Sequence, residues 1–326
     1  MTAHPGPHIP ELPPHAPEIT WVRRLLGDLH VTGLFWIKLH RWAASAVPEW
    51  AMAPLVWVFT GFFFLTLFRI RGAVASNLEA VLGPAGFLER QRRIFRTFHA
   101  FAWCLTERFE RLATERPFDV AVENIEHWHA ALARRCGCVM LTAHLGQYEI
   151  GSMIPASADA PHVHLVREPE VDPRAQAYIR EAVAAVQGAR YTMHFQDGDL
   201  RVPMSLLEAL QRGELVAIQG DRPRTGGRTA QTELFGRPFA VPAGPAALAR
   251  MAGAPLLPVF AIREGRRRFR LVFCPPIRVA QTRNREADIA DAARRFVTDA
   301  EAAIRRAPHQ WFVFRELWPD RRADAL

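Results

Sequence analysis

A histidine and a glutamate five positions apart are the residues whose types and spacing best suit catalysis in this chain. His144 follows a short apolar run, 139–143, of the kind that forms a buried strand, and Glu149 lies between Tyr148 and Ile150. Five positions correspond to about 500° of helix, so the two side chains cannot share one helical face. They can meet if His144 lies in the turn that leaves the strand and Glu149 lies in the first turn of a following helix. The spacing therefore predicts a general base whose imidazole ring is held by a carboxylate.

Arginines follow two further runs that are typical of strands. Arg167 comes directly after the run 163–166, and a charged cluster follows the run 214–219. This cluster contains Asp221, Arg222 and Arg224. Because ligands of parallel sheets bind beyond the carboxyl ends of the strands, we expect these residues to gather beside His144. Guanidinium groups bind phosphate or carboxylate oxygens in a two-pronged manner, so the arginines predict a site for an anionic substrate group.

The surroundings of the predicted base contain no typical nucleophile. The chain has no Gly-x-Ser-x-Gly sequence, and Cys138 lies at the far end of the strand from His144. We therefore expect the substrate to bring its own nucleophile, a hydroxyl whose proton passes to His144 as the oxygen attacks an acyl carbonyl. The backbone N–H groups of Leu145 and Gly146 are the expected donors to the oxyanion, and Glu149 is expected to stabilise the imidazolium.

Strands alternate with helices from residue 117 onward, and this pattern predicts an α/β domain with a largely parallel central sheet and helices on both faces. The expected strands are 118–122, 138–143, 163–166, 214–219, 256–262 and 269–273. The expected helices are 125–135, 173–187, 203–212, 245–251 and 287–306. Ahead of them, an aromatic stripe at helical spacing predicts a long helix over 87–112 whose stripe packs in the core. The expected organisation is a leader (1–18), membrane-associated helices (19–72), a helical connection (73–116) and a catalytic domain (117–326).

Lipid contact is predicted for the N-terminal part of the chain. Residues 1–18 are rich in proline and resemble a disordered leader, whereas 21–42 combine tryptophan with arginine, as interfacial segments do. Residues 50–68 contain no charge, and at about 1.5 Å per residue they just reach the ~30 Å thickness of the hydrocarbon layer. Pro54 and Gly61 interrupt this run. A transmembrane span and a monotopic helix are therefore both open.

The bulk composition favours an anionic partner. The formal net charge is +8, which suits a membrane surface, a phosphorylated lipid or an acidic carrier protein. No nucleic-acid-binding signature occurs, so nucleic acid is not an expected partner. The four cysteines form neither a disulfide framework nor a metal-binding pattern, and reduced thiols in a cytosolic domain are expected. Without a nucleotide-binding loop, no cofactor and no metal are expected.

As an ordered set, these motifs resemble those of the bacterial lipid A late acyltransferases (lauroyl or myristoyl acyltransferases) of the lysophospholipid acyltransferase superfamily. The features that carry the resemblance are His-x4-Glu at 144–149, Arg167, Gly-Asp-Arg at 220–222, and the blocks 235–258 and 308–315. The resemblance extends over roughly residues 20–320. It implies an inner-membrane enzyme with a cytosolic catalytic domain of the glycerolipid acyltransferase type. This enzyme would move an acyl chain from acyl carrier protein or acyl-CoA to a glycolipid hydroxyl.

By motif position, the resemblance implies that His144 and Glu149 are the catalytic pair and that Arg167 and Asp221 are further functional residues. The chain departs from the pattern at its end, where 314–318 read Phe-Arg-Glu-Leu-Trp instead of the usual His-Arg-Arg run. The expected acceptor is therefore a lipid A-like glycolipid or another lipid.

Two other classes of protein remain open. One is a non-catalytic module of the same fold that binds lipid or acyl carrier protein. The other is a metal-assisted hydrolase that uses His144, Glu149, His162 and His164.

Overall fold

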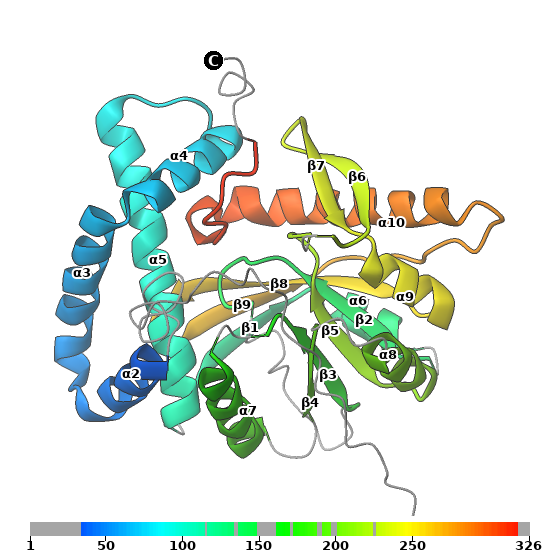
Figure 1. Cartoon of the computed structure of the whole chain (residues 1–326), viewed down its shortest axis with the longest axis horizontal. Coiled ribbons are helices and arrows are strands. Elements are labelled where there is room, and N and C mark those ends of the chain that lie inside the picture. The colour runs from blue at the N-terminus through cyan, green and yellow to red at the C-terminus, as the bar shows by residue number, and fades with distance from the viewer. Residues whose placement is uncertain are drawn as a thin grey trace, which may run out of the picture.

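The computed structural model describes residues 34–114, 116–133, 136–148, 161–169, 172–187, 191–196, 201–223 and 226–318. The expected leader, the part of the basic aromatic segment before residue 34, Glu149 and Arg224 lie outside the described residues. Figure 1 shows a central sheet between helices, with a group of long helices standing along one side of it.

Long helices precede the sheet in the described part of the chain. They are α2 (Leu34–Ala46), α3 (Glu49–Thr66), α4 (Phe68–Leu82) and α5 (Phe87–Ala113). The apolar helix expected over 50–68 ends at Thr66, because Leu67 leaves helical dihedral angles (φ −97°, ψ 61°) before α4 begins. α4 is not among the expected helices, and the division expected after residue 72 falls inside it. α5 matches its predicted range, and Phe98, Phe109 and Leu112 of its apolar stripe are buried.

The central sheet contains seven strands in the order β1-β9-β8-β2-β5-β3-β4. Their bounds are β1 Asp119–Glu123, β2 Cys138–Thr142, β3 Val163–Arg167, β4 Tyr191–Phe195, β5 Leu215–Gln219, β8 Leu256–Gly265 and β9 Arg268–Phe273. Neighbouring strands are parallel except for the β8–β9 pair. The predicted, largely parallel sheet is therefore confirmed, with β4 as an additional edge strand.

Helices cover both faces of this sheet, as the alternating pattern predicts. They are α6 Ile125–Leu132, α7 Pro173–Gln187, α8 Arg201–Gln211, α9 Gly244–Ala252 and α10 Arg285–Arg306. On one face, Val139 and Leu141 of β2 pack in a cluster that contains Leu210, Ala249 and Phe296 of α8, α9 and α10. On the other face, alternate residues of the same strand, Cys138 and Met140, pack in a cluster with Ala131 of α6. β2 is therefore buried from both sides.

A two-stranded hairpin lies outside the central sheet. It pairs β6 (Thr229–Leu234) with β7 (Arg237–Pro242) in antiparallel register. Its two loop residues, Phe235 and Gly236, both have positive φ (55° and 70°), as a type I′ turn requires. The Phe235 backbone N–H donates to Glu301 of α10 (2.8 Å), which docks the turn on that helix. Neither strand of this hairpin is among the strands expected from the sequence.

The register of the parallel strands brings the predicted site residues to one edge of the sheet. Thr142, the last residue of β2, pairs with Gln219, the last residue of β5. His144 and Asp221 each follow two positions later, so they leave neighbouring strands at the same level. The strand ends therefore position both residues before any side-chain contact is considered.

Candidate active site

His144 is held by Asp221 through two hydrogen bonds. The His144 backbone N–H donates to Asp221 Oδ2 (3.0 Å), and the ring nitrogen Nδ1 lies 2.6 Å from Asp221 Oδ1. The indole N–H of Trp311 adds a longer contact to Oδ2 (3.4 Å). Both His144 and Asp221 are buried, at 8 % and 3 % exposure. One carboxylate therefore fixes both the backbone and the ring of the histidine.

Asp221 is the charged member of this pair. Burial alone would raise the pKa of its carboxyl, but attraction to His144 and the hydrogen bond from that ring lower the pKa to about 2. A buried carboxylate needs a donor, so we assign the proton to Nδ1 of the ring. No described residue bonds the opposite ring nitrogen, Nε2. This is the tautomer in which Nε2 can accept a proton from a substrate hydroxyl.

Arg222 brings a positive charge against the same ring. Its Nε lies 3.1 Å from His144 Nδ1. Since Nδ1 donates its proton to Asp221, it cannot also accept a hydrogen bond from Arg222. The positive charge of the guanidinium instead acts on Asp221 and helps to lower the pKa of that carboxyl. Of the described residues, Arg222 is the cation that lies nearest to the ring. Its guanidinium lies on the Nδ1 side of the ring, beside the His144–Asp221 pair.

The loop that carries His144 is fastened by the segment after the last helix, the 3-10 turn η3 (Pro308–Gln310) and the residues that follow it. The Phe312 backbone N–H donates to the His144 carbonyl (2.8 Å), and Leu145 forms an isolated bridge with Trp311. This segment overlaps the block 308–315, which carries part of the family resemblance in the sequence. Its described contacts place it against the loop that carries His144.

The structure corrects the expected oxyanion donors. The Leu145 N–H donates to the Ala143 carbonyl (2.7 Å) and the Gly146 N–H donates to the Gln310 carbonyl (2.8 Å), so both groups are already used within the fold. Gly146 has φ +57°, and a Cβ there would lie 2.1 Å from the Ala261 carbonyl oxygen. Glycine is required at 146 by close backbone packing, and its expected role in substrate binding is not supported.

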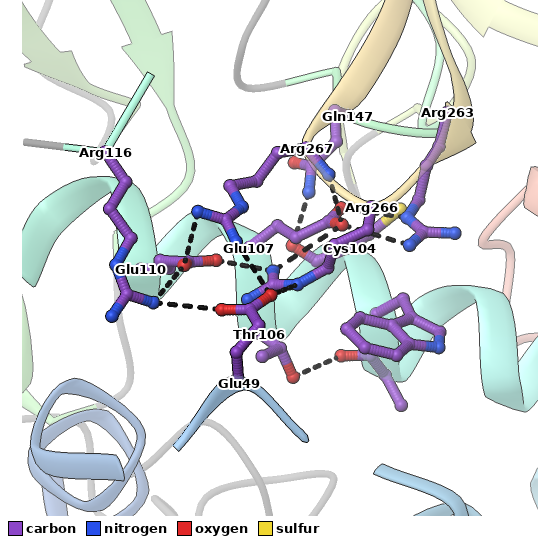
Figure 2. Close-up of polar contacts among 12 residues, drawn as sticks. Glu49, Cys104, Thr106, Glu107, Glu110, Arg116, Gln147, Arg263, Arg266 and Arg267 are labelled. Carbon is purple, nitrogen blue, oxygen red and sulfur yellow. Dashed lines mark hydrogen bonds and ion pairs between the residues drawn. The ribbon is translucent and has the colours of Figure 1, made fainter. Parts of the chain in front are cut away.

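A buried charged cluster joins this loop to α5 (Figure 2). The Gln147 side chain donates to the Cys104 carbonyl of α5. One turn further along α5, the Glu107 carboxylate accepts hydrogen bonds from Nε–H and Nη2–H of Arg263, at 2.8 and 3.0 Å. Glu107 and Glu110 are completely buried, and their partners are arginines of β8 and of the turn before β9 together with Arg116. The helices and the sheet edge therefore meet through ion pairs rather than through apolar packing alone.

The remaining predicted site residues fall into two groups. Arg167 is the last residue of β3, at the same sheet edge as His144 and separated from β2 by β5, as expected. Glu149 and Arg224 lie outside the described residues, so the predicted His144–Glu149 contact stays a prediction. Asp221 makes a contact with the His144 ring of the kind that the sequence analysis expects from Glu149. The available signal was its position, two residues beyond a strand that neighbours β2.

The metal-hydrolase alternative requires His162 and His164 beside His144, and the register separates them. His164 is level with Val216 and therefore with Val139 of β2. His144 lies five residues further along, about 16 Å at the rise of a strand. His164 instead contacts His194 (2.8 Å) and Glu214 (2.7 Å). Within the described ranges, no group of three or more histidine, cysteine or acidic side chains could hold a metal ion.

Thiol chemistry receives no support from Cys104, Cys138 and Cys274. Burial raises the pKa of the Cys138 thiol to about 12, and burial together with Asp299 raises that of Cys274 to about 12. Cys104 is likewise buried, and burial raises its pKa further. A thiolate is the reactive form, so these side chains are poor nucleophiles.

An apolar cavity of about 110 Å³ lies between α2, α3 and α5. Its lining includes Trp36, Val56, Phe63, Ala102 and Phe314. Phe314 is two residues beyond Phe312, whose N–H holds the His144 carbonyl. The cavity is therefore linked to the candidate site through a single stretch of chain.

Comparisons with known proteins show the family of the chain. The family model of the bacterial lipid A biosynthesis acyltransferases matches residues 28–320. The chain therefore belongs to the bacterial lipid A biosynthesis acyltransferase family.

Individual relatives are more distant. The chain is similar to the phosphatidylinositol mannoside acyltransferases of two Mycobacterium tuberculosis strains, CDC 1551 / Oshkosh and ATCC 25618 / H37Rv, at 28 % identity over 156 residues. This match covers 46 % of the chain and 46 % of each relative. A solved structure of the 1-acyl-sn-glycerophosphate acyltransferase PlsC from Thermotoga maritima aligns at 14 % identity with a TM-score of 0.34, covering 77 % of this chain and 98 % of that chain.

Proposed function

We propose that the chain transfers a fatty acyl group from an acyl thioester to a hydroxyl of a lipid A-like glycolipid or another lipid. The donor is acyl carrier protein or acyl-CoA, and the reaction takes place at the bacterial inner membrane with the catalytic domain on the cytosolic side. The observation that carries the proposal is the buried His144–Asp221 pair, whose geometry leaves Nε2 free of described partners.

The proposed reaction is a direct transfer without a covalent acyl-enzyme. His144 Nε2 takes the proton of the acceptor hydroxyl as its oxygen bonds to the thioester carbonyl carbon. The carbon–sulfur bond then breaks, and the thiolate leaves with the proton returned by the imidazolium. Asp221 stabilises the imidazolium between these two steps, and Arg222 offers its guanidinium to the transient oxyanion.

Substrate recognition is proposed for the arginines at the same sheet edge. Arg167, Arg222 and Arg224 suit the phosphate or carboxylate groups that lipid headgroups carry. The apolar cavity beside α5 is the proposed position for the end of an acyl chain, since its lining is almost entirely hydrocarbon. Glu149 stays a candidate for a second carboxylate near the His144 ring, because the His-x4-Glu motif of the sequence predicts this contact.

A transfer assay with purified protein tests the proposal. The protein is incubated with acyl carrier protein or CoA thioesters and, separately, with a lipid A precursor or a phosphatidylinositol mannoside, and the products are identified by mass spectrometry. His144→Ala should lower kcat by on the order of 10²–10⁴-fold, the usual contribution of a general base.

His162→Ala is the matched control, because His162 lies at the opposite end of the sheet, where it bonds Thr192 (2.8 Å). It should keep wild-type activity. A fully active His144→Ala protein, or an acyl group found covalently on the enzyme, would remove the proposed mechanism. Lipid binding without any turnover would favour the non-catalytic binding module.

A further inference from the structure

Helix α3 is apolar around its whole circumference, yet little of it is buried in the protein. No charged residue occurs between Trp50 and Phe68, and the mean hydropathy of the helix is 1.3. The residues buried against the rest of the chain are Met52, Val56 and Thr60. Val58 and Leu65 on the outer face are 68 % and 67 % exposed. The protein interior covers only one face of α3, so the exposed apolar face needs an apolar environment outside this chain.

The other face of α3 packs antiparallel to α5 along its length (Figure 1). At one end, Arg116 bridges Glu49 at the start of α3 to Glu110 near the end of α5, at 3.1 and 3.2 Å. At the other end, the ring of Phe64 lies 5.4 Å from that of Phe95 in the first half of α5. Both ends of α3 are therefore attached to the same neighbouring helix.

α5 cannot enter the hydrocarbon layer, because charged residues occur on it beside both ends of this contact. They are Glu89, Arg90, Arg92, Arg93, Arg96, Glu107, Arg108, Glu110 and Arg111. Buried ion pairs further join α5 to the sheet edge (Figure 2). If α3 crossed a bilayer with this packing intact, the charged ends of α5 and the sheet edge bonded to Glu107 and Glu110 would be carried toward the membrane. A charged side chain costs about 2.5–3.5 kcal/mol at the bilayer centre and less toward the interfaces. The observed packing therefore disfavours a crossing orientation.

We propose that α3 lies in the plane of the membrane interface, with Val58 and Leu65 among the lipid chains and both helix ends on the same side of an anionic bilayer. The inference rests on the proposed function for the presence of a membrane-borne substrate. It deepens that function by deciding between the span and the monotopic helix, and it places the sheet edge with His144 on one side of a bilayer that the chain does not cross through α3.

The residues that border the outer face suit a lipid environment. Trp42 and Trp50 are 63 % and 80 % exposed, and tryptophan is enriched at the headgroup level. Arg69 is exposed just beyond the C-terminal end of α3, where it can meet anionic headgroups.

Labelling of single cysteines from the two sides of the membrane tests the orientation. The four native cysteines are replaced by alanine, and one cysteine is then introduced as Pro48→Cys or Arg69→Cys, the exposed positions that flank α3. Arg283→Cys, in an exposed loop of the sheet domain, is the matched reference. A membrane-impermeant maleimide is added to spheroplasts and to inside-out vesicles. We expect all three positions to be labelled from the same side, whereas labelling of positions 48 and 69 from opposite sides would overturn the proposal.

A depth measurement tests the same orientation independently. A fluorophore is attached to Val58→Cys, at the middle of the outer face, in vesicles of phosphatidylethanolamine and phosphatidylglycerol that contain nitroxide lipids. An in-plane helix buries its apolar face about 5–10 Å, so the shallow nitroxide should quench most strongly. Stronger quenching by a nitroxide at the chain ends would indicate a span. Absence of any quenching on membrane-bound protein would indicate that another protein surface covers α3, and either result would overturn the proposal.

The transfer assay on each labelled variant separates this inference from the proposed function. An active variant whose α3 crosses the bilayer would contradict only the in-plane orientation. A chain that binds vesicles in plane but transfers no acyl group would contradict only the proposed activity. Retained activity also shows that the variant has folded.

Discussion

At the scale of single residues, the two oxygens of Asp221 have different tasks. Oδ1 accepts the ring N–H of His144, while Oδ2 accepts the His144 backbone N–H and the longer contact from Trp311. All these partners are donors, so only a group with two accepting oxygens satisfies them. An asparagine in this position would turn an NH2 group toward at least one donor.

Asp221→Asn should therefore lower kcat by on the order of 10³–10⁴-fold, because the ring loses both its stabilising charge and its fixed tautomer. The measurement is steady-state kinetics of acyl transfer together with a melting curve. Asp288→Asn is the matched control, since Asp288 is also buried but holds Thr282 and Arg250 at the start of α10. It should lower the melting temperature and leave kcat unchanged. Equal effects of the two substitutions on kcat would show that Asp221 is merely structural.

At the scale of elements, Asn77 of α4 ties the helices to the segment that supports His144. Its side-chain NH2 donates to the carbonyls of Val313 (3.0 Å) and Arg315 (2.8 Å), and its oxygen accepts the Leu317 N–H (3.1 Å). Asn77 is 3 % exposed, and so is buried between α4 and this segment. One side chain thus satisfies three backbone groups of a segment without regular secondary structure.

Asn77→Ala should destabilise the fold, because each buried backbone group left without a partner costs about 1–3 kcal/mol. We expect a lower free energy of unfolding in urea, and a lower kcat because the segment that holds the His144 carbonyl is loosened. Ser76→Ala is the control, since Ser76 lies on the same helix without a bond to this segment. Wild-type stability of Asn77→Ala would contradict the importance of these bonds.

The sequence predicts regular elements better than irregular contacts. The physical reason is that a regular element is signalled by many residues close together in the chain, whereas a contact joins residues that are far apart in the chain. α5 and α7 are predicted at nearly their observed bounds, because an apolar stripe repeats over several turns. β4 and the β6–β7 hairpin are missed, since a five-residue strand and a turn formed by Phe235 and Gly236 leave only short signals. His144 is found from its place after a strand. The contact of Asp221 with the ring is not predicted, because Asp221 is distant in sequence and becomes adjacent to His144 only through the β2–β5 register.

At the scale of the whole molecule, acid should destabilise the fold through His309. Burial, and then the charges of Arg96 and Arg93, lower the pKa of this side chain from 6.5 to about 4. Its Nδ1 is buried without a partner in the described part of the chain. The unfolded chain binds a proton on this ring near pH 6.5, whereas the folded chain does so only near pH 4. The stability that depends on a neutral ring is therefore complete above pH 6.5 and is lost as the pH falls through about 4.

His309→Gln should reduce the loss of melting temperature between pH 7 and pH 4, since an amide does not titrate in this range. His129→Gln, at an exposed position of α6, provides the comparison and should leave the loss unchanged. Identical pH dependence of the wild type and His309→Gln would assign the acid sensitivity to other groups.

The buried ion pairs between α5 and the β8–β9 hairpin have a practical consequence for protein engineering. Deleting the chain up to residue 116 would be the usual way to obtain a detergent-free catalytic fragment. That deletion removes Glu107 and Glu110, the carboxylates that Arg263 and Arg266 bind, and it also removes the carbonyl that holds Gln147. The hairpin arginines would then repel one another beside the catalytic loop. Replacing Val58 and Leu65 on the outer face of α3 by polar residues is therefore the sounder route to a soluble enzyme, because it leaves this joint intact.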